Sequence, residues 1–169
     1  MSNAVKKFRQ EKDAFFKGHP QSPIPEHERA SFTGLSYYPY DAALDLQLQV
    51  KRFDDPQEIE MLTSTGEMRP FLRYGELTFE VEGQAVSLVL YFSPGSGHYF
   101  LPFMDATSGD ETYGAGRYLD PEQVIGDTFH IDFNLAYHPF CAYSPNYSCP
   151  IPPEENRLPV SLRVGEKLP

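Results

Sequence analysis

The sequence has no tryptophan, only two cysteines and few basic residues, and each shortage excludes a class of protein. Two cysteines in 169 residues cannot form the disulfide framework of a small secreted domain. Fourteen basic and 24 acidic side chains give a formal charge of −10 and a pI near 4.9. Because nucleic-acid binding needs a basic stripe, and no Lys/Arg run here exceeds a pair, we expect no nucleic-acid partner.

Long apolar runs are missing as well. No stretch approaches the roughly 18 apolar residues of a membrane-spanning helix, and the mean hydropathy is −0.46. Residues 5–16 alternate charged and apolar side chains, which is unlike a signal peptide. We therefore expect an acidic cytoplasmic protein with no membrane partner, forming one domain over residues 1–169. Nothing in the pattern indicates an oligomeric state.

Proline and the smaller aromatics are abundant instead. The chain has 16 prolines, 13 phenylalanines and 11 tyrosines. Phenylalanine and tyrosine suit pleated, half-buried strands, and proline makes the connections between them rigid. The composition therefore favours a β-rich fold with stiff loops.

The N-terminal segment has a helical pattern. Val5, Phe8 and Phe15 recur at helical spacing among charged residues, and Pro20 prevents the helix from continuing. The sequence predicts a helix over residues 4–17, a proline-rich connector over 18–30 and a β domain over 31–169.

Beyond the connector, the hydrophobic period changes to two. Apolar and polar residues alternate in the way expected of half-buried strands over residues 44–50, 77–81, 85–92, 129–133 and 160–164. Gly83 is placed for a hairpin turn, whereas residues 120–123 resemble one short helical turn beginning at a proline. We predict a mainly β fold, an antiparallel barrel or sandwich of about eight or nine short strands with one N-terminal helix.

Two long motifs in the second half of the chain are specific. The first runs from Leu101-Pro102-Phe103 through Asp105 to Glu111-Thr112-Tyr113-Gly114-Ala115-Gly116-Arg117-Tyr118-Leu119-Asp120. The second comprises Asp132-Phe133-Asn134-Leu135-Ala136-Tyr137, Cys141-Ala142-Tyr143-Ser144, Cys149-Pro150-Ile151-Pro152-Pro153-Glu154-Glu155-Asn156 and Gly165-Glu166-Lys167. These motifs resemble the domain-of-unknown-function family numbered 1684, which occurs in bacteria and archaea. The resemblance implies a small cytoplasmic domain and no established activity.

Arg117 is the most informative single residue within these motifs. A guanidinium between tyrosines can bind a carboxylate through two parallel hydrogen bonds. We favour an internal partner, for which Asp105, Asp120, Asp132 and Glu155 are the candidates, over an anionic ligand. In the ligand alternative, the barrel has a polar and aromatic opening that binds a small molecule, which could be anionic. The residues expected to line this opening are Tyr113, Arg117, Asp132, Asn134, Tyr137 and Tyr143. Small-ligand binding is our first functional hypothesis.

An enzyme is the second hypothesis. His130 and Asp132 share one face of a predicted strand at the spacing of two metal ligands, and His138 is the candidate third ligand. The polar face of a strand more often meets only water. Cys141 could instead act as a nucleophile activated by His130 or His138, although a free cysteine is more often a small buried hydrophobe.

The third hypothesis is a purely structural or partner-binding domain. The Gly114–Arg117 run lacks both the dinucleotide-binding glycine spacing and the lysine of a phosphate-binding loop. We therefore expect no cofactor. Candidate catalytic residues are then limited to Cys141, His130 and Asp132.

Overall fold

The computed structural model describes residues 1–169 as a mostly β molecule with one α-helix. The helix is α1 (Asn3–Gly18), and the strands are β1 (Ser36–Tyr37), β2 (Asp45–Gln49), β3 (Lys51–Arg52), β4 (Glu58–Leu62), β5 (Met68–Val81), β6 (Gln84–Ser93), β7 (His98–Phe103), β8 (Arg117–Leu119), β9 (Glu122–Ile125), β10 (Thr128–Asp132) and β11 (Glu166–Lys167). Short 3₁₀ turns lie at η1 (Glu26–Ser31), η2 (Ala42–Leu44), η3 (Phe133–Leu135), η4 (Phe140–Ala142) and η5 (Glu154–Asn156). All strand pairs within the sheets are antiparallel, which confirms the predicted fold class.

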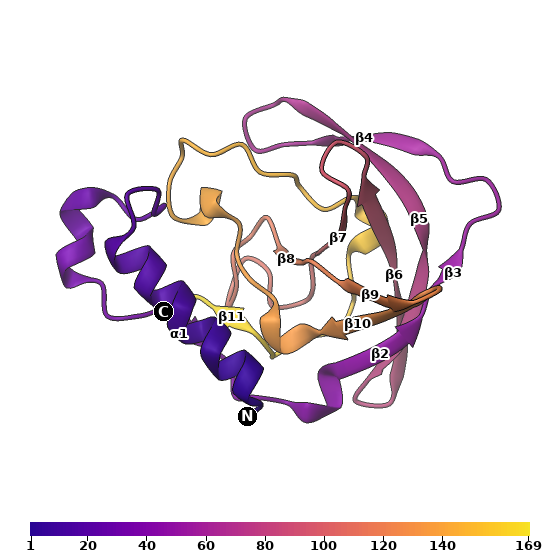
Figure 1. Cartoon of the computed structure of the whole chain (residues 1–169), viewed down its shortest axis with the longest axis horizontal. Helices are drawn as coiled ribbons and strands as arrows, with labels where there is room; N and C mark the ends of the chain where they lie inside the picture. Colours follow the sequence, from indigo (N-terminus) through magenta and orange to yellow (C-terminus); the bar gives the residue numbers. More distant parts are fainter.

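Helix α1 covers one side of the β structure. The Ser2 side chain accepts a hydrogen bond from the amide of Val5 and so caps the first turn. Phe16 is buried and meets the rings of Phe140 and Tyr143 edge-on, with ring centroids 5.8 and 5.1 Å away. The helix therefore packs on the loop around η4, on the side of the molecule opposite the β5–β6 hairpin, and both chain ends lie near it (Figure 1).

The largest sheet is built on the β5–β6 hairpin. Glu82 and Gly83 have φ values of 50° and 82°, as a tight two-residue hairpin turn requires, so the turn predicted at Gly83 is confirmed. Strand β5 runs for 14 residues because a bulge between Arg73 and Gly75 bends it without ending it. Only glycine fits at Gly75, where a Cβ atom would lie 2.6 Å from the carbonyl oxygen of Lys51.

A second sheet has the strand order β2-β10-β9. Leu46, Phe129 and Ile131 contribute to the core from its inner face, as the alternation predicted. The helical turn predicted over residues 120–123 is wrong, because Glu122 and Gln123 pair with β10 as the start of β9. Pairing with β10 therefore outweighs the tendency of the local proline to start a helix.

The strand predicted over residues 160–164 is also wrong. Leu162 and Val164 are fully buried, so the apolar alternation correctly marks core residues. Their backbone carbonyls, however, accept hydrogen bonds from the Arg117 side chain and not from a neighbouring strand. A buried arginine thus replaces a β-ladder as the partner of this segment.

The sheets do not close into a barrel. Strand β7 pairs with β8 only over Leu101–Phe103, and β9 pairs only with β10. No strand therefore connects the first half of β7 to the outer edge of β9, and the sheet stays open between them. This opening leads to the largest hollow in the molecule.

Candidate functional site

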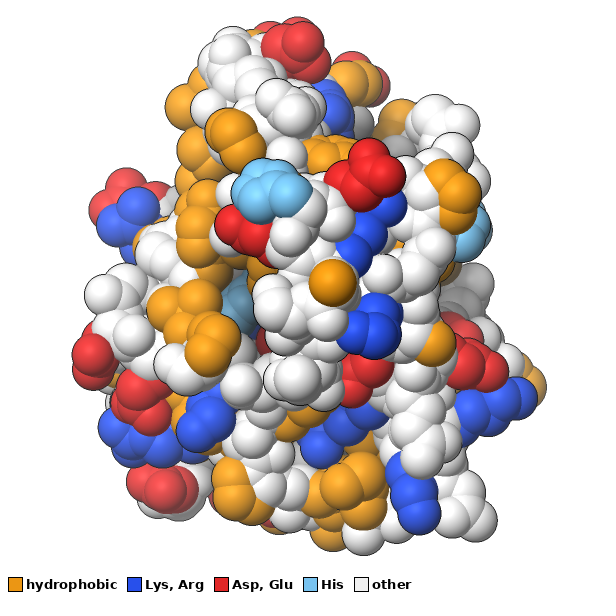
Figure 2. Space-filling view, turned by 90° about the vertical axis from the view of Figure 1, so that its left-hand side faces the viewer, with side chains coloured by type: hydrophobic (Ala, Val, Ile, Leu, Met, Phe, Trp, Pro, Cys, Tyr) orange, Lys and Arg blue, Asp and Glu red, His pale blue; other side chains and the backbone are white.

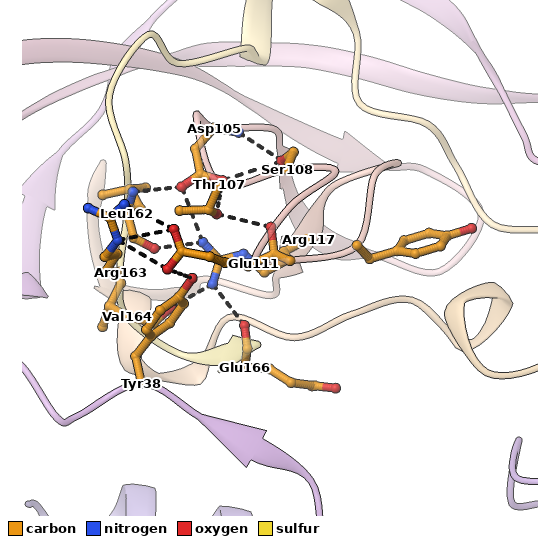
Figure 3. A network of polar contacts seen from close by, with 12 residues as sticks. Tyr38, Asp105, Thr107, Ser108, Glu111, Arg117, Leu162, Arg163, Val164 and Glu166 are labelled. Carbon is orange, nitrogen blue, oxygen red and sulfur yellow. Dashed lines mark hydrogen bonds and ion pairs between the residues drawn. The ribbon is translucent and has the colours of Figure 1, made fainter. Parts of the chain in front are cut away.

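Arg117, the predicted centre of the ligand mouth, is completely buried and bound by the protein itself (Figure 3). One terminal nitrogen donates to the carbonyls of Val164 and Glu166 at 2.6 and 3.0 Å. The other donates to the carbonyl of Leu162 at 2.8 Å and contacts Asp105 Oδ2 at 3.5 Å. The internal partner is therefore Asp105, one of the four expected. The alternative in which Arg117 binds an anionic ligand is wrong, because the terminal nitrogens that would bind it are occupied.

His138 belongs to a second internal network, centred on the fully buried Glu166. The His138 Nδ1 atom lies 3.4 Å from Glu166 Oε1, and the His138 Nε2 atom accepts a hydrogen bond from the backbone amide of Tyr113 at 3.2 Å. Because Nε2 is an acceptor, the proton of the neutral ring is on Nδ1. His138 is 1 % exposed and lies apart from the His130–Asp132 pair, so its predicted role as third metal ligand is wrong.

Lys12 and Tyr143 complete the Glu166 network. Lys12 Nζ lies 2.8 Å from Glu166 Oε2, and the Tyr143 hydroxyl donates to Glu166 Oε1. Burial raises the pKa of Glu166, but the hydrogen bond from His138 and the charge of Lys12 together hold it below its usual value. Tyr143 therefore has a structural partner rather than a free hydroxyl.

The two cysteines are free thiols in a tyrosine-rich environment. Cys141 contacts the Tyr113 hydroxyl and shares no hydrogen bond with a histidine, so the predicted thiol–imidazole pair is not assembled. Burial raises the pKa of Cys149 to about 11, which disfavours the reactive thiolate. The surroundings of both thiols are those of packing residues.

His130 and Asp132 do share a face, as predicted, and Asp45 joins them. The register of β2 and β10 sets Asp45 directly opposite Asp132. His130 Nε2 lies 2.6 Å from Asp45 Oδ1. Asn134 donates to Asp132 Oδ1 from its backbone and from its side-chain amide, at 2.9 and 2.8 Å. The Asn134 side chain also accepts a hydrogen bond from the backbone amide of Asp41 and donates one to its carbonyl. Asn134 therefore joins a loop to this face and is not available to a ligand.

The largest hollow is a groove of about 920 Å³ between the two sheets. Its walls come mainly from the start of β5, from the β6–β7 turn with β7, and from the corner leading into β9, while Tyr137 and Pro150 join from later in the chain. Fifteen residues line it: Arg69, Phe71, Ser93, Ser96, Gly97, His98, Tyr99, Phe100, Tyr118, Asp120, Pro121, Glu122, Gln123, Tyr137 and Pro150. Of the six predicted ligand-binding residues, only Tyr137 is among them.

Aromatic rings form a continuous surface in the groove. Phe71 stacks on Phe100 with ring centroids 5.4 Å apart, and Phe100 meets Tyr118 edge-on at 4.7 Å. Tyr118 in turn meets Tyr137 edge-on at 5.8 Å. Such a surface offers apolar area with a few polar tips, the usual composition of a small-molecule site.

Tyr137 and Asp120 stand at the boundary of this groove. The Tyr137 hydroxyl donates to Asp120 Oδ2 at 2.6 Å, and Lys12 Nζ lies 4.8 Å from the centre of the Tyr137 ring. Surrounding protein raises the pKa of Asp120 by desolvation, against the lowering effect of the Tyr137 hydrogen bond. A second hollow of about 440 Å³ lies beyond these residues, and His130 and Asp132 line it.

Arg69 is the cation of the groove, and sequence reasoning missed it. It donates to the carbonyl of Ser148 at 2.6 Å but forms no ion pair with any carboxylate. Between Met68 and Pro70 it resembles any solvent-facing strand residue, so no local signal distinguishes it. Only the pairing of distant segments places it beside the aromatic surface.

The outer surface of the helical side has no single-sign charge patch. Figure 2 shows this side, where acidic and basic side chains are interspersed with apolar ones. No helix of the structure is both long enough and apolar enough to cross a membrane.

The fold and the groove together define a β-rich domain whose sheets stay open on one side and whose polar motifs form internal networks. The chain belongs to the family described as "Protein of unknown function (DUF1684)", whose sequence pattern matches residues 30–167. The resemblance noted in the two long motifs is thereby confirmed.

A solved structure shares this fold over nearly the whole chain. It is the solution NMR structure of an uncharacterized protein from gene locus rrnAC0354 of Haloarcula marismortui, 38 % identical, with a TM-score of 0.73. The similarity covers 97 % of this chain and 92 % of that one. No curated protein matches the sequence.

Proposed function

We propose that this protein binds a small molecule in the groove between β7 and β9, and that the ligand has an apolar face and an anionic group. The groove volume of about 920 Å³ falls within the roughly 300–1,000 Å³ typical of ligand pockets. The connected rings of Phe71, Phe100, Tyr118 and Tyr137 would contact the apolar face of the ligand.

The single observation that carries the proposal is the unpaired Arg69. The chain has a net charge of −10, yet this guanidinium lines the groove without a carboxylate partner. An arginine presents a planar set of donors that matches a carboxylate or phosphate group. Arg69 therefore takes the role that the ligand alternative gave to Arg117.

The opposite wall would orient the ligand. Asp120, Glu122 and His98 line the groove there, and carboxylates accept hydrogen bonds from hydroxyl or amine groups. A ligand with an anion at one end and donors at the other would fit only one way round. Specificity in such a site comes from these few polar groups and not from the apolar surface.

The test is a titration of the full chain with a panel of carboxylates and phosphates that differ in their apolar part. A raised unfolding temperature, together with a shift of the Arg69 Nε–H resonance, is expected for compounds that bind. Arg69→Gln should abolish both responses, because glutamine retains a donor for Ser148 but not the charge. Arg52→Gln, a control at an exposed arginine on β3, should bind like the wild type.

Two results would overturn the proposal. One is the absence of any response across the panel in the wild-type protein. The other is an unchanged response in Arg69→Gln, which would locate the binding elsewhere. Circular dichroism of the unliganded variant verifies that it is folded.

A further inference from the structure

The polar face shared by β2 and β10 brings three metal-ligating side chains to one point. Asp45 and Asp132 are direct cross-strand partners, and His130 precedes Asp132 by two residues on the same face. One ligand atom from each of these residues lies within 4.8 Å of the other two. Asp45 is exposed, His130 half-buried and Asp132 buried, so the cluster lies where an ion could enter from solvent.

The charges on this face are balanced only in part by the protein. Two carboxylates directly opposite each other on neighbouring strands repel. No lysine or arginine forms an ion pair with either of them, and His130 is the only ionisable partner of Asp45. Arg9 is near enough to act on Asp132 electrostatically, but it donates to the carbonyl of Asn134 and stacks on Tyr37.

Asp132 keeps one carboxylate oxygen free of protein hydrogen bonds. The residue is 7 % exposed, and both hydrogen bonds that its side chain accepts, from Asn134, go to Oδ1. The second oxygen, Oδ2, has no protein donor. This oxygen is open to solvent and is therefore available to an ion that enters the cluster.

We propose that Asp45, His130 and Asp132 form a site for a divalent transition metal such as Zn²⁺ or Mn²⁺. One imidazole with two carboxylates is a ligand set that suits these ions better than Ca²⁺, which takes oxygen ligands. Small side-chain rotations would bring the three atoms to the roughly 2.0–2.2 Å ligand distances of zinc. Asn134 orients Asp132 through its two hydrogen bonds, as residues behind a metal ligand commonly do.

The hollow of about 440 Å³ beside the cluster supplies the remaining coordination space. His130 and Asp132 line it together with Asp120, Glu122 and Tyr137, which also line the larger groove. Three protein ligands leave positions open for water or for a donor atom of a bound molecule. The metal site stands independently of the proposed groove ligand, since none of its three metal ligands lines the larger groove.

The experiment is a calorimetric titration of chelator-treated full-length protein with Zn²⁺ and, separately, with Mn²⁺. One ion per chain is expected, with a shift of the His130 imidazole ¹⁵N resonances for Zn²⁺ and broadening of the same resonances for Mn²⁺. His130→Gln, Asp132→Asn and Asp45→Asn should each weaken binding by about tenfold or more. His27→Gln removes an exposed histidine that lies outside both the cluster and the groove, and it should bind like the wild type.

The proposal fails if the chelator-treated protein binds neither ion, or if the three cluster variants bind like the wild type. Asp132→Asn keeps a carbonyl oxygen that can still accept from Asn134, so this variant is expected to fold. Its far-ultraviolet circular dichroism verifies the fold before the titration. Imidazole shifts confined to other histidines would likewise overturn the assignment.

Discussion

Lys12 in the N-terminal helix and Glu166 near the C-terminus form an ion pair at 2.8 Å, across 154 positions of the chain. The Glu166 side chain is fully buried, and the Lys12 side chain is 12 % exposed. His138 and Tyr143 bind the same carboxylate. This pair joins the helix to the β domain more specifically than the apolar contacts around Phe16.

Removing the charge of Lys12 should strongly destabilise the protein. Lys12→Met leaves the buried Glu166 without its cation, and breaking a buried pair in this way typically costs about 3–5 kcal/mol. Urea unfolding measures the loss. Lys7→Met is the matched control, because the Lys7–Glu11 pair on the same helix is exposed. The Lys7 side chain is 77 % exposed and the Glu11 side chain 67 %. Equal effects of the two substitutions would refute a special role for Lys12.

Glu166 should also contribute to unfolding by acid. Because its folded-state pKa is lowered, its ionised form is bound more favourably in the folded protein than in the unfolded chain. The resulting stability is fully present above the unfolded pKa of about 4.3 and is lost as the pH falls through the folded value. Urea midpoints measured from neutral pH downward should therefore decrease below about pH 4.3. Glu166→Gln should lower stability at neutral pH and flatten this acid limb; an unchanged slope would contradict the assignment.

Arg117 should be required for folding and not for binding. Arg117→Lys replaces a planar set of donors with a single ammonium that cannot serve three carbonyls and Asp105 at once. We expect a loss of about 3–5 kcal/mol in urea unfolding. Arg157→Lys, at an exposed arginine, should change stability by no more than about 0.5 kcal/mol. A fully stable Arg117→Lys protein would show that the network contributes little.

Asp120 should titrate above the ordinary aspartate range. Desolvation raises its pKa, and the hydrogen bond from Tyr137 opposes that shift. Carbonyl-carbon NMR of the Asp120 side chain across acid pH should give a raised midpoint. Tyr137→Phe should move the midpoint higher still, because it removes the opposing hydrogen bond. A lower midpoint in Tyr137→Phe is the result that this explanation does not allow.

Much of the fold could be predicted from local pattern. The period-two alternation located β2, β6 and β10, and the helical spacing before Pro20 located α1. The errors occurred where a distant partner outweighed a local signal. Residues 120–123 have a helix-start pattern but pair with β10, and residues 160–164 alternate like a strand but bind a buried arginine.

The candidate site could be predicted less well. The sequence placed His130 and Asp132 on one face, because strand geometry follows from sequence spacing. It could not provide Asp45, which is 85 residues before His130 and comes beside it only through the register of β2 and β10. Arg69 had no local signal at all.

Residue types and their spacing by themselves determined the acidic character, the N-terminal helix, the β-rich class and the family. The tertiary structure alone decided which polar residues face one another and which are sealed inside. Arg117 and Arg69 have the same chemistry, yet one is enclosed by backbone carbonyls and the other lines an open groove. A side chain's chemistry is local, but its burial and its partners depend on segments brought together by folding, and these decide whether an arginine supports the fold or meets a ligand.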